Sequence, residues 1–155
     1  MKHFNRERGQ SLVELAVSML VLLYLLSGAV EFGLAFFQYV QLRDAAQEGA
    51  LFGSMGPASP SIIARVQGAS SSPVDLAVTS GPQAVTISIT AAESNGTPIA
   101  NVAGACEGDA ITVTVSYNHK VFMPFMSKFI GPTIPLNATV TDTVLSPPQT
   151  NPGCS

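Results

Sequence analysis

The first forty residues are dominated by one long apolar run. Residues 12–30 are apolar apart from Glu14 and three small residues, and the next charge is Glu31. As a helix, the uncharged part between the two carboxylates is about 24 Å long, somewhat short of the hydrocarbon core of a bilayer at about 30 Å. Apolar residues resume from Phe32, so we expect a membrane-spanning segment over about residues 12–37. Five aromatic residues are candidates for the outer headgroup level: Tyr24, Phe32, Phe36, Phe37 and Tyr39.

The helical pattern continues well past membrane length. Apolar, mostly small side chains recur at helical spacing and form a narrow stripe: Leu42, Ala45, Ala46, Gly49, Ala50 and Gly53. Such a stripe lets another backbone approach closely. We interpret it as the face that packs against the following domain of the same chain, and contact with another subunit is the alternative. Gly56 and Pro57 predict the end of the helix, so residues 10–54 should form one helix of about 70 Å.

Residues 55–155 change from a helical to an alternating pattern. Residues 84–90 and 110–117 alternate β-branched apolar residues with hydroxyl residues, which is typical of half-buried strands, and residues 136–145 repeat the pattern. A short helix is predicted over residues 59–66. A long helix followed by a small antiparallel β-rich domain gives an α+β fold.

The segment between the last two predicted strands is aromatic and apolar. It reads Val121-Phe122-Met123-Pro124-Phe125-Met126 and continues through Phe129 and Ile130. Pro124, with Pro132 just beyond, is expected to prevent a long strand here.

Basic residues gather at the N-terminus. Lys2, Arg6 and Arg8 lie in the first nine residues, although the chain has a net charge of −3 and only 11% charged residues. Short positively charged flanks stay in the cytoplasm. We therefore expect a single-pass inner-membrane protein with a cytoplasmic N-terminus and a β-rich domain in the periplasm or outside the cell. The other basic residues are too scattered to follow nucleic-acid phosphates, so membrane lipid is an expected partner and nucleic acid is not.

Two cysteines, Cys106 and Cys154, both lie in the part expected to be exported. An oxidising compartment permits a disulfide, and closing a loop of roughly fifty residues stabilises a fold by about 4 kcal/mol through chain entropy. We favour this disulfide over two free thiols. A metal site is the weaker alternative, because no second pair of ligands stands at suitable spacing.

A glycine and a carboxylate mark the boundary between the basic stretch and the apolar run. Gly9 lies at the boundary, and Glu14 follows five positions later inside the apolar run. A charge in hydrocarbon costs several kcal/mol, so an intramembrane carboxylate indicates a functional site. A secretory signal needs only an apolar core and a small-residue cleavage site, and it has no use for such a group.

Two regions of the chain resemble the TadE-like family, pilin-like minor components of the tight-adherence (Tad/Flp) branch of type IV pilus systems. The stronger region comprises Arg8-Gly9-Gln10-Ser11-Leu12-Val13-Glu14-Leu15-Ala16, Glu31-Phe32-Gly33 and Ala45-Ala46-Gln47-Glu48-Gly49-Ala50. The weaker region comprises residues 111–117, the aromatic segment after them, and the chain from Leu136 onwards.

The resemblance implies a subunit that is cleaved and then assembled. A prepilin peptidase would cut between Gly9 and Gln10, removing residues 1–9 as a basic leader. In pilin-like proteins the carboxylate corresponding to Glu14 is thought to engage the N-terminal amine of a neighbouring subunit, and Glu31 is a second candidate charge partner. The implied partners are the peptidase, other pilin-like subunits and the pilus assembly machinery. One departure is Gln10, which stands where typical type IV pilins have phenylalanine.

Nothing in the sequence predicts an enzyme, a cofactor or a metal site. There is no Gly-x-Ser-x-Gly motif, His3 lies in the leader, and His119 stands alone after a strand. We interpret His119 as a surface or turn residue. The leading function is therefore a pilin-like protein that helps to make or anchor an adhesive pilus. The alternative is an unprocessed single-pass membrane protein whose β-rich module binds a surface ligand.

Overall fold

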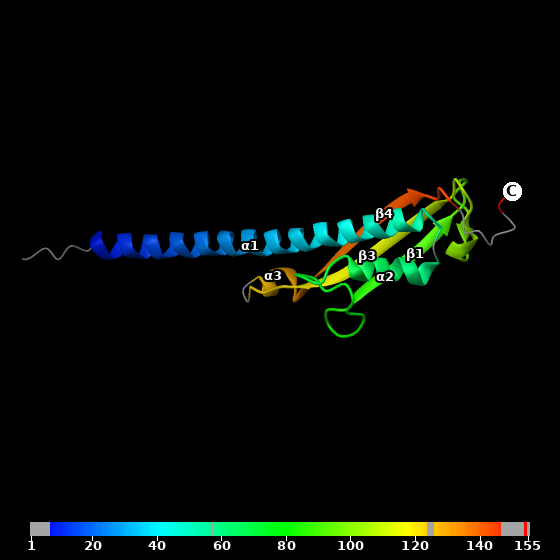
Figure 1. Ribbon diagram of the computed structural model, residues 1–155. Coiled ribbons are helices and arrows are strands. Elements are labelled where there is room, and N and C mark those ends of the chain that lie inside the picture. Colours follow the sequence, from blue (N-terminus) through cyan, green and yellow to red (C-terminus); the bar gives the residue numbers. More distant parts are fainter. Residues whose placement is uncertain (1–6, 57, 124–125, 147–153, 155) are drawn as a thin grey trace, which may run out of the picture.

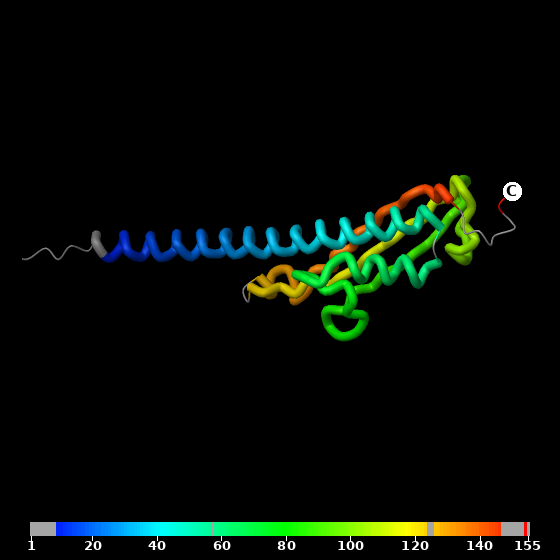
Figure 2. The backbone as a smooth tube through the Cα atoms, viewed as in Figure 1, coloured from blue at the N-terminus to red at the C-terminus, as the bar shows by residue number. Residues whose placement is uncertain are grey.

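The computed structural model describes residues 7–56, 58–123, 126–146 and 154. Its main feature is a 47-residue helix, α1 (Glu7–Gly53), whose first half projects beyond the rest of the protein and whose second half packs against it (Figures 1 and 2). The other elements are α2 (Ser59–Gly68), β1 (Val85–Ala92), β2 (Pro98–Ile99), η1 (Val102–Gly104), β3 (Ala110–Lys120), α3 (Ser127–Ile130) and β4 (Thr133–Thr143).

The strands form one antiparallel sheet in the order β2-β1-β3-β4. Val113 of β3 lies between Ile89 of β1 and Val140 of β4. The expected α+β fold, with a long helix before a small antiparallel sheet, is confirmed. The observed strands differ from the predicted ones at their ends, because β3 continues to Lys120 and β4 begins at Thr133. The two-residue strand β2 was not predicted, because it is too short to give an alternating pattern.

The alternating residues separate into two faces of the sheet. Ile111, Val113 and Val115 are fully buried on the face that α1 and α2 cover. On the opposite face, hydroxyl side chains pair across β3 and β4, as in the 2.8 Å contact between the Oγ1 atoms of Thr112 and Thr141. Burial on one side and hydroxyl contacts on the other explain the alternating pattern.

The small-residue stripe of α1 is buried inside the chain. Ala46 and Ala50 are fully buried, and a Cβ placed on Gly53 would lie 2.6 Å from the Ile111 side chain of β3. A Cβ on Gly49 would overlap the Val66 side chain of α2. The interpretation of the stripe as an intrachain packing face is therefore confirmed, because glycine lets α1 approach both α2 and the sheet.

Cys106 and Cys154 form a disulfide that joins positions 48 residues apart. It links Cys154, near the C-terminus, to the turn that precedes β3. The favoured interpretation of the two cysteines is thus confirmed.

Intact protein isolated without reductant should be two hydrogens lighter than the reduced chain, and neither cysteine should react with an alkylating reagent. After reduction, both thiols should alkylate, which provides the control. Alkylation of both thiols in native protein from an oxidising compartment would contradict the disulfide.

Candidate functional site

The first half of α1 carries the apolar run with no part of the described chain packed on it. Every side chain from Gly9 to Leu26 is exposed, and burial begins only at Ser27 and Gly28. A contiguous apolar surface along all of this stretch is unfavourable in water, and it marks a surface that lipid or another protein covers. Among the described residues, α1 is also the helix long and apolar enough to cross a membrane.

Glu14 is the one carboxylate on this exposed apolar surface. Gln10 Nε2 donates a hydrogen bond to Glu14 Oε1 at 3.1 Å, one helical turn away, and Ser18 Oγ donates to the Glu14 carbonyl at 2.8 Å. Within the described residues no cation pairs with Glu14. Its carboxylate therefore remains accessible to a positively charged group from outside the chain.

Gly9 precedes this carboxylate and has no packing role. A Cβ added at Gly9 would meet nothing within 4 Å, so the fold itself does not require a glycine there. Residues 1–6, which carry most of the basic leader, lie outside the described residues.

A buried polar cluster fixes α1 to the sheet where the exposed half of the helix ends. The carboxylate of Glu31, which is only 1% exposed, accepts a hydrogen bond from His119 Nε2 at 2.8 Å. It also accepts from the backbone N–H groups of Phe122, at 3.1 and 3.2 Å, and Met123, at 3.1 Å. His119 Nδ1 lies 2.6 Å from Oε1 of Gln38, which is two helical turns after Glu31 on α1. Every polar group of this cluster thus has a partner, as a buried charge requires.

The interpretation of His119 as a surface or turn residue is wrong. His119 is fully buried, because β3 runs on to Lys120 and position 119 continues the inward-facing series that includes Tyr117. Burial also raises the pKa of the Tyr117 hydroxyl above its usual value.

One signal in the sequence could have revealed this cluster. Glu31, Ala35, Gln38 and Leu42 follow one another at helical spacing, and all four are buried. The packing stripe of α1 therefore begins three turns before the stripe of small residues. The start of this stripe is hard to recognise in the sequence because Glu31 and Gln38 are polar, whereas buried helix faces are usually identified from apolar residues.

Residues 9–51 match the family model described as TadE-like protein. The matched segment covers nearly all of α1, and it includes Gly9, Gln10, Glu14 and Glu31. The resemblance predicted from the sequence is confirmed over this segment. Comparisons with curated proteins and with solved structures gave no match. TadE-like proteins are structural components of pili and are not known as an enzyme family.

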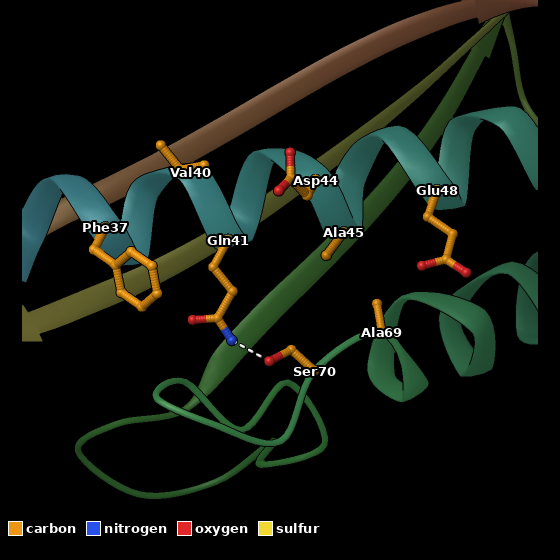
Figure 3. Close-up of a pocket in the computed structure, with 8 residues that line it drawn as sticks. All are labelled: Phe37, Val40, Gln41, Asp44, Ala45, Glu48, Ala69 and Ser70. Carbon is orange, nitrogen blue, oxygen red and sulfur yellow. Dashed lines mark hydrogen bonds between the residues drawn. The ribbon is translucent and has the colours of Figure 1, made fainter.

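The end of the TadE-like segment is tied to α2 and the loop after it by polar contacts around a shallow groove (Figure 3). Gln41 Nε2 donates to Ser70 Oγ and, at 2.9 Å, to the Val74 carbonyl. Glu48 pairs with Arg65 of α2 at 2.7 Å. These contacts account for Gln41, Ser70 and Glu48 as packing contacts between α1 and the segment that begins with α2.

No cluster of three or more His, Cys, Asp or Glu side chains in the described part of the chain is placed to hold a metal ion. Within the segment that matches the family model, packing among the described residues does not explain the exposed apolar half of α1 or the carboxylate of Glu14 on it. We take these as the candidate functional site.

Proposed function

We propose that this protein is a pilin-like membrane subunit that helps to assemble or anchor a Tad-type adhesive pilus. The observation that carries the proposal is the exposed carboxylate of Glu14 on an uncovered apolar helix, within a segment that matches TadE-like proteins. A membrane covers such a helix before assembly, and neighbouring helices cover it afterwards.

The helix would cross the inner membrane with its N-terminus in the cytoplasm and the sheet domain on the exported side. Burial against the domain begins near Gly28, and Glu31 is committed to His119 of the same chain. From Gly9 to Gly28 the helix rises about 30 Å, close to the thickness of a hydrocarbon core. We therefore place the membrane-spanning part at residues 9–30 and not as far as residue 37.

Cleavage after Gly9 would supply the charge partner of Glu14. Gln10 would then carry a free α-amino group, which is positively charged near neutral pH. An unpaired carboxylate in hydrocarbon is costly, and an amine from an adjacent helix relieves that cost. Glu14 would thus select a neighbour whose processed N-terminus lies at the same depth in the membrane.

A Gly9→Val variant is expected to accumulate in the membrane as the longer, uncleaved precursor. A side chain at this position obstructs the close approach of a peptidase to the backbone, whereas the fold has space for it. The matched control is Gly33→Val, since a Cβ at Gly33 also meets nothing within 4 Å. The measurement is the intact mass of each membrane-extracted protein.

The Gly33→Val protein should have the same mature N-terminus as the wild type. Normal cleavage of the Gly9→Val protein would contradict the assigned processing site. An uncleaved wild-type chain would instead support the alternative of an unprocessed membrane protein with a ligand-binding module.

A further inference from the structure

The described part of the connection between β3 and β4, residues 121–123 and 126–132, lies beside α1 at the point where the exposed half of the helix begins. In Figure 1 its short helix α3 lies at the end of the domain nearer the free half of α1. The Met126 side chain lies 3.7 Å from the position of a Cβ on Gly28. The backbone N–H groups of Phe122 and Met123 donate to Glu31. These contacts fix the height of the connection along α1.

This height coincides with the exported-side membrane surface, provided that α1 crosses the membrane as proposed above. Gly28 is about 30 Å along the helix axis from Gly9, and a hydrocarbon core is about 30 Å thick. The connection therefore lies at the boundary between acyl chains and headgroups on that side.

The described side chains of the connection are unusually apolar for an exposed loop. Phe122 is 64% exposed and Phe129 is 78% exposed, and Ile130 is exposed beside it. On α1, the exposed Phe32 lies about 6 Å beyond Gly28 along the helix axis and stacks with Phe36 one turn further on, with ring centroids 6.2 Å apart. Exposed aromatic rings near the boundary of the hydrocarbon core are typical of a membrane interface.

The described lysines and several acidic residues lie at opposite ends of the domain. Both lysines of the described chain, Lys120 and Lys128, lie at the end of the domain near Gly28. The opposite end of the sheet, where β1 ends and β3 begins, carries the acidic residues Glu93, Glu107, Asp109 and Asp142. Basic groups near a membrane surface are attracted to anionic lipid phosphates.

We propose that the β3–β4 connection is a second membrane-contact element of this protein. Phe122, Phe129 and Ile130 enter the boundary between headgroups and acyl chains of the exported-side leaflet, and Lys128 lies among the lipid phosphates. Together with α1, this contact gives the domain two points of attachment and holds its orientation relative to the membrane.

A single tryptophan can measure this contact, because the chain contains none. Phe129→Trp keeps an aromatic ring at an exposed site and should not disturb the fold. The full-length protein is reconstituted into phosphatidylcholine–phosphatidylglycerol vesicles that mix lipids brominated near the headgroup with lipids brominated near the methyl end of the acyl chain. Leu22→Trp, in the middle of the exposed apolar helix, is the control for membrane insertion. Leu145→Trp, an exposed site at the opposite end of the domain, is the control for water.

We expect the brominated lipid to quench Phe129→Trp strongly, as it quenches Leu22→Trp, and to leave Leu145→Trp unchanged. If Leu22→Trp is quenched while Phe129→Trp behaves like Leu145→Trp, the lipid contact is overturned and the membrane-spanning helix stands. Shielding of Phe129→Trp from both brominated lipid and aqueous acrylamide would mean that another protein surface covers it, and this also overturns the proposal. An unquenched Leu22→Trp would overturn the membrane span and this inference together.

Discussion

A Glu14→Gln variant is expected to be inserted and processed normally and yet to form no pili. Glutamine keeps the size of the side chain and makes the helix less costly to place in hydrocarbon, so insertion should not suffer. The lost charge removes the attraction to the N-terminal amine of a neighbouring subunit, which in a medium of low dielectric constant is the strongest contact that this surface offers. The measurements are pilus number by electron microscopy, adherence, and the mature N-terminus of the membrane-bound protein.

The control for this variant is Ser18→Ala, one helical turn further along the same exposed helix. Ser18 is also polar, but its hydroxyl bonds only to the backbone carbonyl of Glu14. Its loss should leave piliation unchanged. Normal piliation by the Glu14→Gln strain would rule out the charge pairing and would leave the membrane topology standing.

A His119→Leu variant is expected to lose about 3–5 kcal/mol in the free energy of unfolding, the range found when removal of one partner leaves a buried charge uncompensated. Leucine fills the space of the ring but leaves the buried Glu31 carboxylate without its side-chain donor. The measurement is denaturant unfolding of the detergent-solubilised protein with the disulfide intact. Asn118→Ala, at the exposed neighbouring position of β3, should change the free energy by no more than about 0.5 kcal/mol.

The double variant Glu31→Leu/His119→Leu should be more stable than His119→Leu alone, because it removes the unpaired buried carboxylate. It should not regain wild-type stability, since the backbone N–H groups of Phe122 and Met123 lose their acceptor. A His119→Leu protein as stable as the wild type would show that the cluster is not what holds α1 on the sheet.

Much of the fold is visible in the sequence because it depends on local periodicity. The apolar run of α1 repeats with helical spacing, and the hydroxyl and β-branched residues of β3 alternate with a period of two. These patterns show which segments form helices and which form strands. The disulfide could also be predicted, because a chain with two cysteines offers only one intrachain pair.

The junction between α1 and the sheet could not be predicted in the same way. Glu31 and His119 are 88 positions apart along the chain, and each looks unremarkable within its own element. Only the docking of α1 along β3 brings the carboxylate, the imidazole and the Phe122 backbone N–H together. The same docking sets the position of residues 121–123 and 126–132 along α1, so the proposed membrane contact of this loop depends on the tertiary structure. Pro124, from which the sequence predicted an interrupted strand, lies outside the described residues.

The most direct test of the central claim is the first residue of the mature protein in membranes of cells with and without the prepilin peptidase. We expect the mature chain to begin at Gln10 when the peptidase is present, and to retain the leader with Lys2, Arg6 and Arg8 when it is absent. A chain that keeps Met1 or His3 in both strains would contradict the assignment of this protein as a processed pilin-like subunit.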